Sequence, residues 1–187
     1  MDERRRFALE RFDSPHHCSH VAQLFSLGHI RTMSDSKPIT KEEFEQMTRC
    51  LVGLPITRPW RGGGSALFLE LGSLADTGAS RGKPKGEATV MIEWSWRVES
   101  PRAIVFGSWC GVRKIDRGIQ NLAGLNIEDI SLVGRLPEIM IQLSGGRWIQ
   151  SFMTADGQPV WTLFLLDGGL LYVERGCVFR GRRKQRV

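Results

Sequence analysis

The sequence predicts an α+β domain, in which an N-terminal helix packs on a mostly antiparallel, meander-type curved β-sheet of about seven strands. Two observations lead to this prediction. A helix-start signal followed by a single apolar stripe occurs near residue 40. Strand-like segments then follow one another toward the C-terminus, and glycine-containing turn signals separate those of the last third at even intervals.

The composition is that of one ordinary globular domain. The chain has 187 residues, of which 41% are hydrophobic and 25% are charged, a balance typical of globular proteins. No apolar run reaches the roughly 18 residues that a membrane-spanning helix needs. No apolar segment of signal-peptide length follows the N-terminus either. We therefore expect a cytoplasmic protein that makes no contact with a membrane.

The positive charge is concentrated at the C-terminus. The net charge is +6, yet residues 1–36 contain five arginines and five acids, and residues 180–187 contain five basic residues and no acid. Residues 37–179 are therefore close to neutral. This predicts a flexible leader over 1–36, a single α+β domain over 37–179 and a basic tail over 180–187. Met33 is an alternative start, in which case residues 1–32 would not belong to the native protein.

The helix is predicted from its capping pattern. Thr40 and Glu43 have the spacing of a capping box, in which each side chain accepts a hydrogen bond from the other residue's backbone amide. Gly53 and Pro55 then end the helix, because glycine tolerates a left-handed cap and proline has no amide hydrogen. The apolar stripe of the helix is expected to consist of Phe44, Met47 and Leu51.

Strand-like segments rich in β-branched and aromatic residues follow the helix. Residues 76–86 are rich in small and polar residues and are expected to form a flexible loop. The pattern of residues 113–126 is ambiguous and is compatible with one helical turn. Turn signals at residues 145–146, 156–157 and 167–168 are eleven residues apart and predict an up-and-down meander of four strands. The predicted strands are 66–71, 88–98, 103–109, 139–143, 148–154, 160–166 and 170–174.

Three segments carry a resemblance to a known family. They are Trp-Arg-Gly-Gly-Gly-Ser-Ala-Leu-Phe-Leu-Glu-Leu-Gly at 60–72, Glu-Trp-Ser-Trp-Arg at 93–97 and Gly-Arg-Leu-Pro-Glu at 134–138. In this order they resemble a family of small, uncharacterised bacterial β-rich proteins, a domain of unknown function, over residues 45–175. The resemblance implies a bacterial origin and one compact domain. It implies no activity and no catalytic residue.

Polar and aromatic side chains are predicted to share one face of the sheet. Glu70 interrupts an apolar run, and alternation places Glu93, Ser95 and Arg97 on one side of a strand. Glu138 repeats this pattern with Met140 and Gln142, and Arg147 and Ser151 can lie on the same side. Such a face has three interpretations: a solvated surface with cross-strand ion pairs, a recognition surface for a protein or small polar ligand, or an active site with paired carboxylates.

A second candidate site is the segment Arg58-Pro-Trp60-Arg61 with the three glycines that follow it. Successive glycines let backbone amides point together at an anion, which two arginines can clamp. In the alternative interpretation this segment is a flexible approach to the first strand, with Trp60 covering the sheet edge. The candidate ligand-binding residues are thus Arg58, Trp60, Arg61, Glu70, Glu93, Ser95, Arg97 and Glu138.

No pattern in the sequence specifies a metal, a cofactor or a catalytic group. His16, His17, Cys18 and His20 are zinc-type ligands, but no second pair follows at zinc-site spacing. Every histidine precedes residue 30, and there is no Gly-x-Ser-x-Gly motif. We expect reduced thiols, with three of them buried as small hydrophobic side chains: Cys50, Cys110 and Cys177.

These patterns favour a non-enzymatic binding module, which engages a protein partner or a small polar ligand through a polar-aromatic sheet face. One alternative is an enzyme that acts on a polar substrate through Glu70, Glu93 or Glu138. Another is association with nucleic acid through the basic tail. An open meander leaves strand edges exposed, and a homodimer is one way to cover them.

Overall fold

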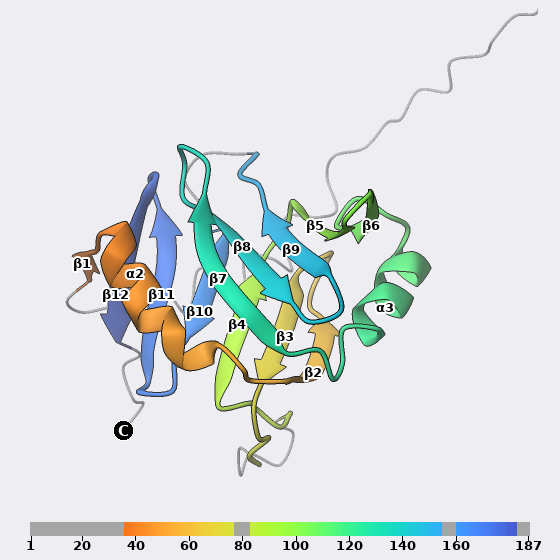
Figure 1. Ribbon diagram of the computed structural model, residues 1–187, viewed down its shortest axis with the longest axis horizontal. Helices are drawn as coiled ribbons and strands as arrows, with labels where there is room; N and C mark the ends of the chain where they lie inside the picture. Colours follow the sequence, from red (N-terminus) through yellow and green to blue (C-terminus); the bar gives the residue numbers. More distant parts are fainter. Residues whose placement is uncertain (1–35, 77–82, 155–159, 183–187) are drawn as a thin grey trace, which may run out of the picture.

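In the part of the chain that the structure describes, two antiparallel β-sheets pack with two short α-helices (Figure 1). The computed structural model describes residues 36–76, 83–154 and 160–182. The seven-stranded sheet has the order β1 (Lys37–Pro38), β12 (Cys177–Arg182), β11 (Gly169–Glu174), β10 (Trp161–Phe164), β4 (Ala88–Ile92), β3 (Leu67–Leu71) and β2 (Ile56–Arg61). The five-stranded sheet has the order β6 (Ala103–Gly107), β5 (Trp96–Ser100), β9 (Arg147–Ser151), β8 (Glu138–Leu143) and β7 (Ile127–Val133).

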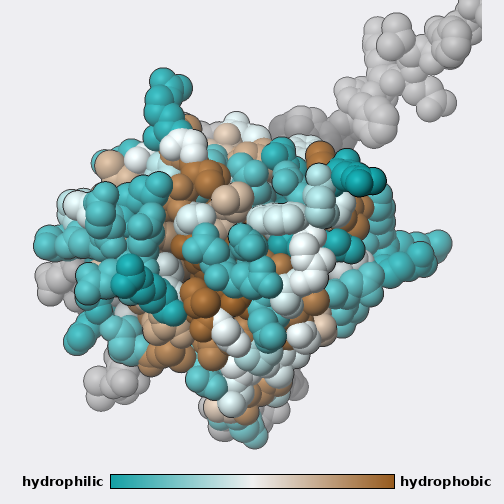
Figure 2. Space-filling view, viewed as in Figure 1, coloured by the Kyte–Doolittle hydropathy of each residue, from teal (hydrophilic) through white to brown (hydrophobic). Residues whose placement is uncertain are grey.

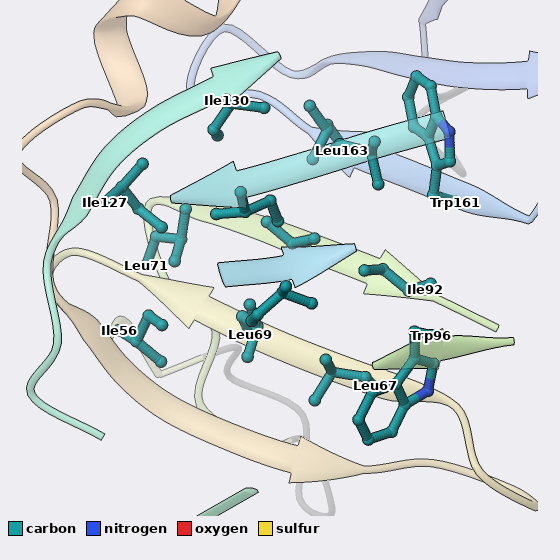
Figure 3. Packing of buried hydrophobic residues seen from close by; sticks show 14 of the residues in the cluster. Ile56, Leu67, Leu69, Leu71, Ile92, Trp96, Ile127, Ile130, Trp161 and Leu163 are labelled. Carbon is teal, nitrogen blue, oxygen red and sulfur yellow. The ribbon is translucent and has the colours of Figure 1, made fainter. Parts of the chain in front are cut away.

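The mostly antiparallel α+β class predicted from the sequence is confirmed, but the single curved sheet of about seven strands is wrong. The inner faces of the two sheets share one hydrophobic core (Figure 3). Trp96 at the start of β5 and Trp161 at the start of β10 are both fully buried in it. Burying aromatic side chains of this size is a large part of the driving force for folding.

The predicted helix forms with the predicted cap. It comprises α2 (Lys41–Thr48) and a 3₁₀ turn, η1 (Arg49–Leu51). The Glu43 amide donates to Thr40 Oγ1 at 3.2 Å, and the Thr40 amide donates to Glu43 Oε2 at 2.8 Å. Gly53 follows with a φ of +89°. The predicted apolar stripe faces the core, with Phe44 and Leu51 buried and Met47 packed against them.

The predicted strand 88–98 is in fact two strands in two different sheets. β4 ends at Ile92 and β5 begins at Trp96, and residues 93–95 carry the chain from one sheet to the other. The cause is local: Ser95 has a φ of +60°, a left-handed conformation that interrupts the extended backbone. As a result, Ile92 and Trp96 are both buried, whereas Trp94 between them is 42% exposed.

The predicted four-strand meander is also divided between the sheets. β8 and β9 form a hairpin in the five-stranded sheet, and β10 and β11 form a hairpin in the seven-stranded one. The predicted turn at 156–157 lies outside the described residues. β9 ends at Ser151, and the amide of the next residue, Phe152, donates to the carbonyl of Ser95 in the crossover segment.

Other expectations need smaller corrections. Residues 113–126 hold a full helix, α3 (Val112–Gln120), whose buried side chains are Ile115 and Ile119. The strands β1, β2, β7 and β12 were not predicted, and the first three residues of the expected tail belong to β12. The expected leader up to residue 35, the centre of the expected 76–86 loop and the end of the tail lie outside the described residues.

Of the described cysteines, Cys50 and Cys177 are not buried as predicted, whereas Cys110 is partly buried against the core. Cys50 and Cys177 are exposed and Cys110 is half-buried, all three as free thiols. Cys50 belongs to the short η1 turn and Cys177 begins β12 directly after a tight turn, so both lie where the chain is at the surface. Cys18 lies outside the described residues.

Backbone pairing also joins the sheets at one corner. The amide of Gly53 donates to the carbonyl of Ile127, and the amide of Ile127 donates to the carbonyl of Leu54. The approach to β2 is thereby tied to the start of β7. Within the described residues, no helix has the length and apolar character that crossing a membrane would require.

Candidate binding surface

The structure distributes the eight predicted site residues over four places. One group lies on the outer side of β2 and β3, and Arg61 lies beside α3. A third group lies where the chain changes sheets, and Arg97 lies on the outer face of the five-stranded sheet. The predicted single cluster is therefore not assembled, and each place has to be assessed by its own contacts.

Glu70, Trp60 and Arg58 come together, but as a structural support for a loop. The Glu70 carboxylate is 3% exposed and accepts hydrogen bonds from Trp60 Nε1 at 3.1 Å, Thr89 Oγ1 at 2.6 Å and the Gly86 amide at 3.0 Å. Arg58 donates to the carbonyl of Pro84 at 2.9 Å. These bonds connect β2, β3 and β4 with the chain that enters β4, and they leave the Glu70 carboxylate few free acceptor positions.

The rings of this group are stacked in layers. Trp60 lies flat on Phe68 with ring centroids 3.9 Å apart, and the Lys83 ammonium lies 4.7 Å from the centre of the Trp60 ring. A cation held over an indole face is stabilised by the ring's quadrupole. Both faces of Trp60 are therefore engaged within the protein.

Arg61 does not form an anion clamp with Arg58. Its guanidinium donates to both carboxylate oxygens of Asp116, at 2.6 and 3.5 Å, and to the carbonyl of Gly64 at 2.7 Å. The hydrogen bond to Asp116 raises the pKa of Arg61. This bidentate ion pair connects β2 to α3, so the guanidinium already has the kind of partner that an anionic ligand would supply.

Glu93, Ser95 and Glu138 lie at the end of the molecule where the chain changes sheets. Ser95 is buried and its hydroxyl lies 2.9 Å from that of Thr154. The Glu138 carboxylate accepts hydrogen bonds from Ser151 Oγ at 2.7 Å and from the Met153 amide. Glu93 is different: burial raises the pKa of its carboxyl, and no hydrogen bond to that carboxyl joins it to the described residues.

A polar-aromatic sheet face does exist, on the outer side of the five-stranded sheet. Cross-strand pairing aligns Gln142, Trp148 and Glu99 in one row, and Met140, Gln150 and Arg97 in the next. We call these six residues the five-stranded face. Period 2 correctly placed Arg97, Met140 and Gln142 on it, whereas Ser151 points into the core and is buried.

The five-stranded face is ordered by its own contacts. Arg97 Nε donates to Glu99, and Arg97 NH2 donates to Gln150 Oε1 at 3.3 Å. The same guanidinium lies 5.6 Å from the ring centre of Phe152. No helix crosses in front of β8 and β9 (Figure 1), and polar and apolar side chains lie next to each other on this side of the molecule (Figure 2).

A second exposed surface, which the sequence analysis missed, adjoins this face. Ile104 and Val105 of β6 are 63% and 38% exposed, and Trp109 and Val112 beyond it are 81% and 56% exposed. We call these four residues the β6 patch. The sequence does signal the basic character of its surroundings: residues 102–117 contain four basic residues and one acid, an excess that the near-neutral total for 37–179 conceals.

A cavity of about 190 Å³ lies beside the β6 patch. Val105 and Phe106 of β6, Gly118 and Leu122 in and after α3, and Arg147 at the start of β9 line it. Among the described residues, no group of three or more histidine, cysteine or acidic side chains is placed to hold a metal ion. The histidine-rich segment 16–20 lies outside them.

The chain matches no protein-family model, no curated protein and no solved structure. The resemblance to small bacterial β-rich proteins stays a prediction.

Proposed function

We propose that this protein is a non-enzymatic binding module that engages a protein partner through the five-stranded face. The observation that carries the proposal is Trp148. It lies between Gln142 and Glu99 in a cross-strand row, is only half-buried, and its indole N–H has no hydrogen-bond partner among the described residues. Tryptophan is enriched among the residues that dominate binding energy at protein interfaces.

The surroundings of Trp148 support this proposal. Its neighbours are carried on β5, β8 and β9, and side chains on strands are positioned more precisely than those on loops. Hydrogen bonds to Glu99 and Gln150 already fix the Arg97 side chain. Binding a partner would therefore cost little additional side-chain entropy at Arg97. An aromatic centre surrounded by ordered polar groups has the composition typical of an interface.

An enzyme that acts through Glu70, Glu93 or Glu138 has less support. The carboxylates of Glu70 and Glu138 already accept several hydrogen bonds from the protein. Burial raises the pKa of Glu93, as a candidate acid requires, but no contact within the described residues joins its side chain to a second carboxylate. We place the binding activity in the cytoplasm, in accordance with the sequence.

The experiment compares the wild-type protein with Trp148→Ala and with Trp94→Ala as the control. Trp94 is also exposed, but it lies on the crossover between the sheets. Proteins captured from cells of the source organism are identified, purified and titrated against all three forms. We expect at least one partner to bind Trp148→Ala about tenfold or more weakly than wild type and to bind Trp94→Ala normally. Equal affinity for the wild type and Trp148→Ala would disprove the proposal.

A further inference from the structure

Among the described residues the two sheets have four edge strands, and three of these are protected. β1 has two residues, one of which is Pro38. β2 contains Pro59 and packs against α3. β7 is covered where the segment 53–54 bonds to Ile127. Short strands, prolines and covering segments are the means by which proteins prevent edge-to-edge pairing.

β6 lacks these three protections, although a register shift interrupts its pairing with β5 between Val98 and Glu99. It has five residues and no proline, and it pairs with β5 on one side only. Ser100 pairs with Ala103 next to the hairpin turn, and Glu99 pairs with Ile104 as the following pair. The pair that closes a two-residue hairpin is hydrogen-bonded, and bonded and non-bonded pairs then alternate. The N–H and C=O of Ile104, which lies on the turn side of a register shift between Val98 and Glu99, therefore point away from β5. No backbone group elsewhere in the described residues bonds to Ile104 or Val105.

Basic side chains outnumber acidic ones around β6, and the two acids there, Glu99 and Asp116, are paired with Arg97 and Arg61. Arg102 lies in the β5–β6 turn, and Arg113, Lys114 and Arg117 lie on α3, all four exposed. Within the described residues the four basic side chains have no acidic partner, so they favour an acidic ligand.

We propose that β6 accepts an extended, acidic segment of a protein partner as an additional strand of the five-stranded sheet. This inference rests on the proposed function, since Ile104 lies opposite Glu99 in the row that contains Trp148. Alternate side chains of an added strand lie on opposite faces of the sheet. Apolar ones contact the β6 patch, and the cavity lined by Val105 and Leu122 accepts one of them, while acidic ones pair with the basic residues of α3.

Two other occupants fit these observations less well. A second copy of the chain would bring the same basic residues of α3 and the β5–β6 turn against one another, which costs free energy. Nucleic acid would pair with the basic residues, but it would use neither the free backbone groups of β6 nor the exposed Ile104, Val105 and Val112. An acidic, strand-forming peptide uses all three features together.

The test uses two short fluorescent peptides, one of alternating Glu and Val and the other of alternating Lys and Val. We expect the Glu-Val peptide alone to bind, with an affinity that falls as the salt concentration rises. Because its strand would bond to the outward N–H of Ile104, hydrogen exchange at that amide should slow on binding. Equal binding of the two peptides, or unchanged exchange at Ile104, would overturn the inference.

Two variants locate the binding, each with a matched control. Ile104→Glu removes apolar contact and repels the acidic peptide, and Val52→Glu makes the same kind of change at a 47% exposed residue after η1. Arg117→Glu reverses one charge of α3, and Arg135→Glu reverses an exposed charge in the β7–β8 turn. We expect about tenfold weaker binding for Ile104→Glu and several-fold weaker binding for Arg117→Glu, and no change for either control.

The remaining outcomes separate this inference from the proposed function. If the partner found with Trp148→Ala binds Ile104→Glu normally, β6 is not its docking strand and the proposed function stands. If no partner is sensitive to Trp148→Ala, the proposed function fails, and the peptide titration decides β6 by itself. A concentration-dependent dimer that Ile104→Glu abolishes, or an oligonucleotide that displaces the Glu-Val peptide, would assign β6 to a second copy or to nucleic acid and overturn the inference.

Discussion

The ring of Phe106 lies so close to the backbone of Gly118 that a Cβ atom at residue 118 would come within 2.7 Å of it. This contact holds α3 against β6, beside the cavity that both elements line. Phe106 itself is 4% exposed and packs edge-on against Trp96, with ring centroids 5.7 Å apart. Trp96 therefore blocks movement of the ring on one side.

Gly118→Ala should destabilise the protein although alanine is the better helix former. The helix gains about 1 kcal/mol from the replacement, but overpacking against a confined ring costs about 1–3 kcal/mol. Urea denaturation would measure the difference, with Gln120→Ala, an exposed position in the same helix, as the control. If both variants raised the free energy of unfolding, the close approach of Gly118 and Phe106 would be refuted.

Glu70→Gln should lower the free energy of unfolding by about 1–3 kcal/mol, because an amide cannot accept all the hydrogen bonds that the buried carboxylate accepts. At least one of Trp60 Nε1, Thr89 Oγ1 and the Gly86 amide would face the new NH₂ group. Thermal unfolding would measure this loss. Glu45→Gln is the control, since it removes only an exposed ion pair with Lys41 at 3.8 Å, a kind of pair that contributes little.

Glu93→Gln should stabilise the protein at neutral pH. Burial raises the pKa of Glu93 in the folded state above its ordinary value of 4.5, so the folded state binds this proton more tightly than the unfolded state does. The contribution of Glu93 to stability is therefore fully present below pH 4.5 and is lost as the pH rises through the raised pKa. Melting curves of both forms should differ at pH 7 and converge near pH 4. If the difference in melting temperature between the two forms were the same at both pH values, the raised pKa of Glu93 would be contradicted.

Arg175→Asn should raise the free energy of unfolding by about 0.5–1 kcal/mol. Arg175 and Gly176 connect β11 to β12 with φ values of +49° and +72°, and Asn-Gly is the preferred pair for such a turn. Arg102→Asn in the β5–β6 turn is the control, because Arg102 does not have a positive φ. A gain of the same size in both variants would mean that the backbone conformation of Arg175 is not the cause.

Local signals predicted local structure well. The capping box at Thr40 and the glycine at 53 set both ends of the first helix, because each acts through hydrogen bonds or φ angles of its immediate neighbours. The change of sheet at Ser95 could not be predicted in this way. A serine with positive φ is rare, and alternation from Ala88 to Val98 continues through it in the sequence although the backbone turns there.

The candidate site shows the same limit. Period 2 correctly grouped Arg97, Met140 and Gln142, since each alternates with buried residues on its own strand. It could not show that Glu70 and Arg97 belong to different sheets, because the order of strands depends on distant contacts. The β6 patch was missed because Ile104 and Val105 are typical strand residues, and strand propensity does not say whether a partner strand covers them.

The pairing of Ile92 in β4 with Trp161 in β10 means that the chain leaves the seven-stranded sheet and returns to it at the same place. All five strands of the five-stranded sheet, β5 to β9, therefore come from the one stretch of chain between β4 and β10. The five-stranded sheet includes the local hairpins β5–β6, β7–β8 and β8–β9, and its longest pairing, β5 with β9, closes a shorter loop than β4 with β10 does. We expect the five-stranded sheet to form first and β10 to dock late, so that core substitutions in β10 accelerate unfolding more than they slow folding.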